Sequence, residues 1–154
     1  MPVVTLIDAA ALLPERGALL GLDLGTKTIG VAASDPDRRV AAPVETIART
    51  RFQLDAKRIL ELAAERKAAG LVLGLPINMD GSEGPRAQST RAFARNLAQL
   101  SELPIALWDE RLSTAAVERA LIDADASRAK RKAVIDQHAA TFILQGALDR
   151  LARK

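Results

Sequence analysis

Three short apolar runs in the first third of the chain predict β-strands. They span Leu19–Leu22, Thr28–Ala33 and Arg39–Ala48, and turn-forming residues separate them. Gly25–Lys27 is short enough to make a tight turn, so the first two strands form a hairpin. Pro43 lies inside the third strand, where proline is best tolerated at a sheet edge or a bulge. We therefore predict three consecutive antiparallel strands.

The hydrophobic period changes after residue 50. Arg51–Ala69 has apolar residues at helical spacing, and Gly70 is expected to end this helix. The predicted apolar stripe contains Leu54, Ile59, Leu62 and Ala63, whereas Asp55, Lys57, Arg58, Glu61 and Glu65 are expected to face water.

Helices and buried strands then alternate to the end of the chain. The predicted elements are a strand at Leu71–Pro76, a loop at Asn78–Gly84, a helix at Pro85–Leu100, a strand at Pro104–Trp108 and helices at Thr114–Ala124 and Ala133–Leu151. This order predicts an α/β fold with a mixed five-stranded sheet, three antiparallel strands followed by two parallel ones, flanked by helices. We expect residues 1–16 to be an N-terminal extension and residues 17–154 to be one domain.

The composition narrows the chemistry. The chain has no cysteine and one histidine, which excludes thiol nucleophiles, cysteine-ligated zinc and multi-histidine metal sites. The absence of cysteine fits a cytoplasmic protein. A net charge of +3 is compatible with a polyanionic partner. The apolar start of the chain lacks basic residues and is interrupted by Asp8, so we expect neither a signal peptide nor a membrane anchor.

Three carboxylates occupy positions where carboxylates are unexpected. Asp23 lies inside the first strand, Glu110 follows the strand at Pro104–Trp108, and Asp136 lies among apolar residues of the last helix. Ligands gather outside the carboxyl ends of strands in open α/β sheets. If the last helix crosses these strand ends, all three side chains come within reach of one another.

A cluster of carboxylates requires cations to neutralise it, and oxygen ligands favour Mg²⁺ or Mn²⁺. Two such ions support phosphodiester hydrolysis, one activating water and one stabilising the leaving oxygen. A basic segment precedes Asp136 and is placed to hold phosphates as a loop. It contains Arg128, Lys130, Arg131 and Lys132.

Each of these residues also has a structural interpretation. Asp23 could cap the turn, and Glu110 could form a salt bridge with Arg111 or Lys27. Asp136 could be a partly exposed helical residue, and the basic segment could be solvated. We expect Asp109 to point away from the site, since successive strand residues face opposite ways.

Four segments together resemble the YqgF/RuvX family of ribonuclease H-like proteins, described as pre-16S rRNA nucleases or Holliday-junction-resolvase-like enzymes. The segments, in order, are GLDLGTKTIGVAAS, VLGLPINMDGSEG, WDERLST and IDQHAATFILQ. The resemblance covers residues 17 to 151. It implies a ribonuclease H fold with catalytic, metal-binding carboxylates at Asp23, Glu110 and Asp136. It also implies that Lys27, Asn78, Ser82 and Arg111 lie toward the nucleic acid.

The leading hypothesis is a metal-dependent endonuclease acting on pre-16S rRNA or on branched DNA such as a Holliday junction. One alternative is a catalytically inactive nucleic-acid-binding protein of the same fold. Another is a phosphate-binding unit of the actin/hexokinase type, which the single copy of the DLGTK motif disfavours. Symmetric cleavage of a junction requires two active sites, so we expect a homodimer.

Overall fold

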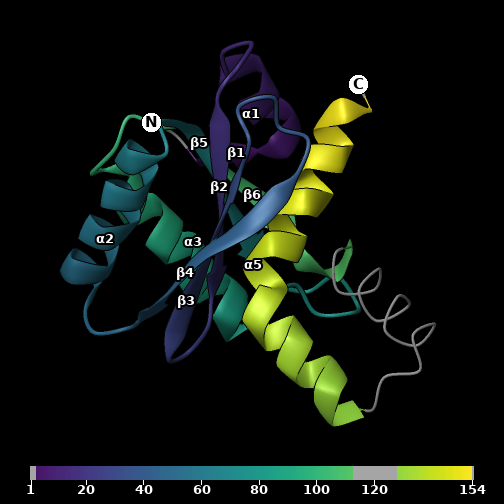
Figure 1. Cartoon of the computed structure of the whole chain (residues 1–154). Helices are drawn as coiled ribbons and strands as arrows, with labels where there is room; N and C mark the ends of the chain where they lie inside the picture. The colour runs from purple at the N-terminus through teal and green to yellow at the C-terminus, as the bar shows by residue number, and fades with distance from the viewer. Residues whose placement is uncertain (1–2, 113–127, 154) are drawn as a thin grey trace.

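The computed structural model of the chain describes residues 3–112 and 128–153, with the side chains of residues 128–137 excepted. A mixed sheet forms its centre (Figure 1). The strands are β1 (Val3–Thr5), β2 (Ala18–Leu24), β3 (Thr28–Ser34), β4 (Ala41–Ala48), β5 (Ala68–Leu75) and β6 (Ile105–Asp109). The helices are α1 (Leu6–Leu12), α2 (Phe52–Glu65), α3 (Pro85–Ala98) and α5 (Arg128–Ala152).

The sheet has the strand order β1-β6-β5-β2-β3-β4. β2, β3 and β4 are antiparallel neighbours, whereas β5, β6 and β1 continue the sheet in parallel from β2. The predicted α/β class with a mixed sheet is confirmed, but the predicted number of strands is wrong. β1 is a sixth strand, and its three residues pair with β6, about one hundred residues later in the chain. A run this short has no detectable period, so only the distant partner identifies it.

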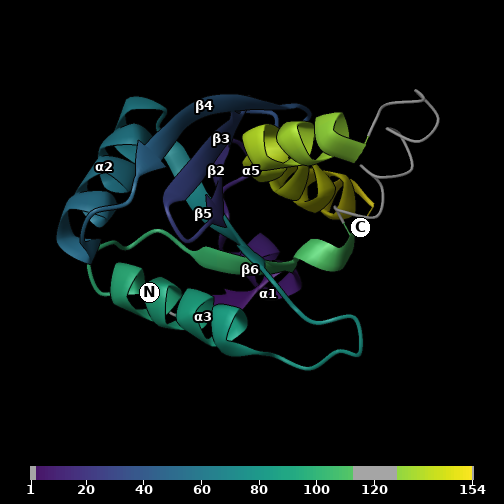
Figure 2. The ribbon, with the colours of Figure 1, turned by 90° about the horizontal axis from the view of Figure 1, so that it is seen from below.

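Alternation along the strands separates two hydrophobic layers. Leu20 and Leu22 of β2 pack with α2 and α3, whereas Leu19 packs with α5 on the opposite face. Figure 2 shows α2 and α3 on one side of the sheet and α5 on the other. Gly21 lets α5 approach closely, because a Cβ there would lie 2.6 Å from the Cβ of Leu144. The face beneath α5 is the one that carries the candidate site.

β4 confirms the expectation for Pro43. β4 is an edge strand, and its register with β3 shifts between Val31 and Ala32, so that Val31 pairs with Glu45 and Ala32 with Pro43. Because Pro43 lies at the bulge, its missing N–H does not remove a hydrogen bond from a regular position of the ladder.

The predicted helix at residues 51–69 ends too late. α2 ends at Glu65, because Lys67 takes a left-handed backbone conformation with φ 52° and β5 begins at Ala68. Gly70 does not end the helix: it is buried within β5, where a Cβ would lie 3.0 Å from the side chain of Leu13.

Two residues of α2 have the opposite solvent exposure from the one predicted. Leu54 is exposed, and Asp55 is buried with its carboxylate accepting a hydrogen bond of 3.2 Å from the backbone N–H of Thr50. A carboxylate in the first turn of a helix can satisfy nearby N–H groups, and this local bond outweighs the average preference of Asp for water.

α5 starts earlier than predicted. It begins at Arg128, so the basic segment is the first turn of this helix and not a loop. The loop was expected because cations at a helix N-terminus interact unfavourably with the helix macrodipole. The high helix propensity of Ala, Lys and Arg outweighs this effect. The predicted helix at residues 114–124 lies outside the described residues. No helix in the described ranges is long and apolar enough to cross a bilayer.

Candidate active site

Asp23 lies on the sheet face that α5 covers. It pairs in register with Gly30 of β3. A Cβ on Gly30 would lie 3.8 Å from the Cβ of Asp23 and 3.5 Å from the Cβ of Ala140 in α5. The side chains of Leu22 and Leu24 point into the opposite layer. Strand alternation therefore directs the carboxylate of Asp23 under α5, away from the larger core.

Glu110 reaches the same face from β6. It follows the last residue of the strand and begins a helical turn. Its side chain lies over Gly74 of β5, where an added Cβ would come within 2.8 Å of the Oε1 atom of Glu110. Ile143 of α5 contacts the same space. The absence of a side chain at position 74 thus creates the room in which Glu110 lies.

Asp23 and Glu110 form one carboxyl pair. Burial raises the pKa of Glu110 to about 7, and the negative charge of Asp23 and a hydrogen bond between the two side chains act in the same direction. Two close carboxylates resist simultaneous ionisation, so their proximity favours either a retained proton or a bound cation. The structure brings together these two residues, which the sequence analysis chose on different grounds.

Asp136 belongs to the helix that covers this pair. It lies on α5 one turn before Ala140, which packs beside Gly30 and thus beside the β-strand partner of Asp23. The side chain of Asp136 lies outside the described part of the chain. Among the side chains that are described, no group of three or more potential metal-ligating residues occurs.

The loop between β5 and α3 is held together by the polar residues that the family resemblance directed toward nucleic acid. The Nδ2 atom of Asn78 donates to the Oγ atom of Ser82 at 3.1 Å, and Ser82 donates to Asp80. Arg111 donates to the carbonyl of Asn78 at 3.3 Å. These side chains shape the loop beside the carboxyl pair.

Arg111 does not pair with Glu110. Its guanidinium forms a salt bridge with Asp109, with 2.7 Å between the Nη2 and Oδ2 atoms. This contact lowers the pKa of Asp109 below its ordinary value. Asp109 lines a hollow on the α3 side of the sheet, as expected from alternation. The structural interpretation of Glu110 as a partner of Arg111 is thus wrong.

The other predicted cations divide into two groups. Lys27 is exposed in the β2–β3 turn, at the end of the sheet that carries Asp23. Arg128, Lys130, Arg131 and Lys132 lie in the first turns of α5, and their side chains lie outside those that the structure describes.

Arg86 is a site residue that sequence reasoning missed. It is exposed in the first turn of α3, and its positive charge opposes the rise in the pKa of Glu110. The fold of the loop between β5 and α3 explains why Arg86 lies near Glu110. Arg111 ties this loop to the end of β6, and Gly84, at the start of α3, packs against Asn78. In the sequence, the position of this arginine directly after Gly84 and Pro85 is only a weak indication of a site residue.

Comparisons with known proteins identify relatives over nearly the whole chain. A protein of Rhodopseudomonas palustris (strain BisB5) named "Putative pre-16S rRNA nuclease" is 76% identical over 150 residues, 97% of this chain and 94% of that protein. A protein of the same name from Bradyrhizobium sp. (strain BTAi1 / ATCC BAA-1182) is 74% identical over 151 residues, 98% of this chain and 94% of that protein.

A solved structure described as "T. thermophilus RuvC in complex with Holliday junction substrate" has the same fold. It superposes with a TM-score of 0.59 at 13% sequence identity, covering 88% of this chain and 96% of that one. The sequence profile of the family described as "RuvX: Holliday junction resolvase" matches residues 17–150. These findings confirm the resemblance that the four motifs indicated, and the chain belongs to the RuvX family.

Proposed function

We propose that the protein is a metal-dependent endonuclease that hydrolyses phosphodiester bonds in structured nucleic acid. The observation that carries this proposal is the contact between Asp23 and Glu110 on the sheet face beneath α5. The family description and the names of the relatives support nuclease chemistry. Asp23, Glu110 and Asp136 are the proposed catalytic and metal-binding residues.

The carboxyl pair fits a divalent cation. Asp23 and Glu110 supply oxygen ligands, and burial together with the charge of Asp23 raises the pKa of Glu110 to about 7, so that a bound cation would relieve the repulsion between the two carboxylates. Hard cations such as Mg²⁺ or Mn²⁺ prefer this donor set. With Asp136 on the covering helix, three carboxylates would hold two ions. When bound, these ions lower the pKa of water and stabilise the leaving oxygen.

The protein's own residues orient and neutralise the substrate. Glu110 lies over Gly74 next to Ile143 and forms a hydrogen bond with Asp23 beneath α5. Arg86 is the described cation whose charge acts on Glu110, and we assign it to a phosphate near the scissile bond. Lys27, Asn78, Ser82, Arg111 and the basic first turns of α5 are proposed contacts to the flanking backbone.

The proposed substrate is pre-16S rRNA, with 5′ maturation as the reaction, because close relatives over the full chain carry that name. A branched DNA junction is the second candidate, because the family description names Holliday junction resolution. Two symmetric cuts in a junction require two active sites, so that activity would accompany a homodimer. Both substrates agree with a cytoplasmic protein.

The inactive nucleic-acid-binding protein remains the alternative function. The presence of all three carboxylates in the sequence disfavours it, since a binding protein gains nothing from a partly buried acidic pair that repels phosphate. The phosphate-binding unit of the actin/hexokinase type is disfavoured by the identities above 70% to proteins named as nucleases.

The decisive experiment compares wild type with Asp23→Asn on two labelled substrates, a 16S rRNA precursor fragment and a four-way DNA junction. We expect Mg²⁺- or Mn²⁺-dependent cleavage of at least one substrate, abolished by EDTA and by Asp23→Asn while binding persists. Asp149→Asn is the matched control, because it makes the same change at an exposed position outside the pair and should cleave normally. Binding without cleavage of either substrate by wild type would instead favour the binding-protein alternative.

A further inference from the structure

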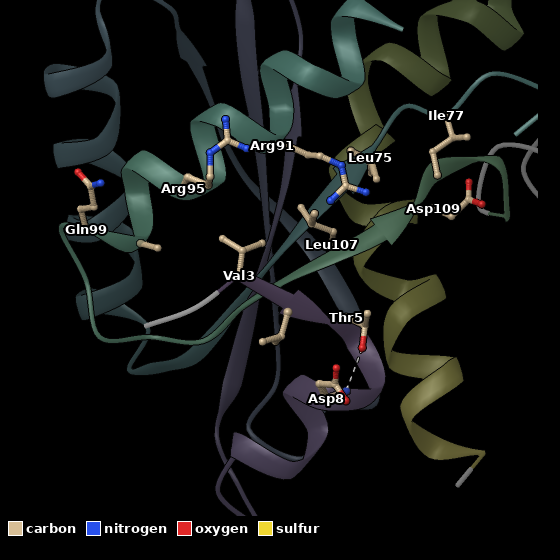
Figure 3. Close-up of a pocket in the computed structure, with 12 residues that line it drawn as sticks. Val3, Thr5, Asp8, Leu75, Ile77, Arg91, Arg95, Gln99, Leu107 and Asp109 are labelled. Carbon is tan, nitrogen blue, oxygen red and sulfur yellow. Dashed lines mark hydrogen bonds between the residues drawn. The ribbon is translucent and has the colours of Figure 1, made fainter. Parts of the chain in front are cut away.

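A large groove lies on the side of the sheet opposite to the carboxyl pair. It has a volume of about 1040 Å³ and runs between α3 on one wall and β1 with α1 on the other (Figure 3). The floor is apolar and comes from three neighbouring strands, with Val3 of β1, Leu107 of β6 and Leu75 of β5. Ligand sites in proteins commonly enclose 300–1000 Å³, so the groove has room for several chemical groups.

One row of polar side chains on α3 borders this floor. Arg91, Arg95 and Gln99 are four residues apart, so they lie on the same helix face, and all three line the groove. Arg91 is held by Glu83, with 2.8 Å between its Nη2 atom and a carboxylate oxygen. Arg95 is exposed and has no acidic partner among the residues that the structure describes. The α3 wall therefore offers hydrogen-bond donors and an available positive charge.

One end of the groove is formed by residues that are neighbours in the sequence of those at the candidate active site. Asp109 lines the groove, and Glu110, the next residue, belongs to the carboxyl pair on the other face. Leu75 and Ile77 line the groove directly after Gly74, which lies beneath Glu110. Figure 3 shows Ile77 and Asp109 at one end of the groove and Arg95 and Gln99 toward the other. A polymer bound at the carboxyl pair would cross the edge of the sheet near Ile77 and Asp109 to reach the groove along α3.

We propose that this groove binds a single-stranded polynucleotide segment that flanks the cleavage site. The inference rests on the proposed function for the identity of the polymer. Nucleobases have apolar faces that fit the floor of Val3, Leu75 and Leu107, and guanidinium groups bind phosphates and stack on bases. Arg95 and Arg91 lie beside that floor, at the spacing of successive helical turns.

The wall formed by β1 and α1 provides a way to test whether the groove binds a polyanion. Asp8 lines the groove from α1, where its backbone N–H is capped by Thr5 (Figure 3). The charge of Asp109 is balanced by Arg111, so Asp8 is the acidic group that would oppose a phosphate chain. For a polyanion, removing Asp8 must strengthen binding and removing Arg95 must weaken it. A mixed-charge protein partner that contacts both walls would lose affinity with either change.

The test measures binding of fluorescein-labelled twelve-residue oligouridylate and oligothymidylate by anisotropy in EDTA, where cleavage is prevented. These two probes separate single-stranded RNA from single-stranded DNA as the source of the polynucleotide. We expect Arg95→Ala to weaken binding about three- to tenfold and to reduce the salt slope by about one, as for a lost phosphate contact. Asp8→Asn is expected to strengthen binding about two- to threefold. Arg150→Ala, an equal charge change at an exposed site on α5, is the control and should change binding less than twofold.

Equal binding by Arg95→Ala and Arg150→Ala would overturn the proposal, and so would weaker binding by Asp8→Asn. Photo-crosslinks from 4-thiouridine probes should map to peptides of α3, β1 or β6; crosslinks confined to α5 would also overturn it. Cleavage of a substrate without a single-stranded flank distinguishes the groove proposal from the nuclease proposal. Arg95→Ala should cleave this substrate as fast as wild type does. If wild type binds the oligonucleotides through Arg95 but cleaves no substrate, only the nuclease proposal is refuted.

Discussion

Asp109 and Glu110 are neighbours in the sequence but lie in opposite electrostatic environments. Asp109 faces the α3 side and pairs with Arg111, which lowers its pKa, whereas Glu110 faces the α5 side, where burial and Asp23 raise its pKa to about 7. The first carboxylate is satisfied by the protein and anchors a loop. The second is partly buried beside another carboxylate and is suited to bind a cation. Strand alternation at the end of β6 separates these roles.

The largest expected difference between the two carboxylates is in activity. Glu110→Gln should reduce the cleavage rate more than about 100-fold, because even partners behind metal ligands contribute 10- to 100-fold. Asp109→Asn should reduce it less than about tenfold, through a loosened loop. Cleavage rates under saturating Mg²⁺ or Mn²⁺ measure both. Equal losses in the two variants would contradict the division of roles.

The next effect concerns stability as a function of pH. The folded-state pKa of Glu110, about 7, lies above its ordinary value of 4.5, so the folded state binds this proton more tightly than the unfolded state. In EDTA, the free energy of unfolding should therefore fall as the pH rises from about 4.5 to 7, by on the order of 3 kcal/mol, and level off above pH 7. Urea titrations between pH 4 and pH 9 test this.

Glu110→Gln is the control for the pH measurement, since it removes the titrating group and should flatten the decline. Addition of Mg²⁺ at pH 8.5 should restore stability to wild type but not to this variant. A wild-type curve without a decline between pH 4.5 and pH 7 would show that folding does not raise the pKa of Glu110.

The smallest of the three effects comes from Gly74→Ala, which leaves every charge in place. The added methyl group would overlap the side chains of Glu110 and Ile143, so we expect about 1–2 kcal/mol lower stability and roughly tenfold slower cleavage. Circular dichroism melts and cleavage rates measure the two losses. Gly70→Ala is the matched control, because it adds the same methyl group in the same strand, 3.0 Å from the side chain of Leu13 and away from the carboxyl pair, so it should lower stability and leave cleavage unchanged.

The candidate residues could be chosen from the sequence because charged residues inside apolar runs are visible locally. Asp23, Glu110 and Asp136 stand out without any knowledge of the fold. Arg86 does not, because an arginine on the exposed first turn of a helix is ordinary. Only the folded loop, anchored by Arg111 and packed through Gly84, brings it near Glu110.

The misplaced elements have a similar explanation. β1 depends on pairing with β6, and the buried position of Asp55 depends on its hydrogen bond with Thr50. Hydrophobic period detects long amphipathic elements well, but it cannot detect a three-residue strand or a carboxylate that satisfies a nearby N–H group. The groove along α3 was also invisible, because its floor and walls come from four separate segments.

The amino-acid sequence by itself determined the α/β class, the family and the carboxylates of the candidate site, because periodicity and motif spacing are properties of the chain. Tertiary structure decided which carboxylate pairs with Arg111, which one contacts Asp23, and where a groove forms on the surface. These outcomes depend on distances between residues far apart in the sequence. Burial and electrostatic energies depend on such distances, and no local pattern contains them.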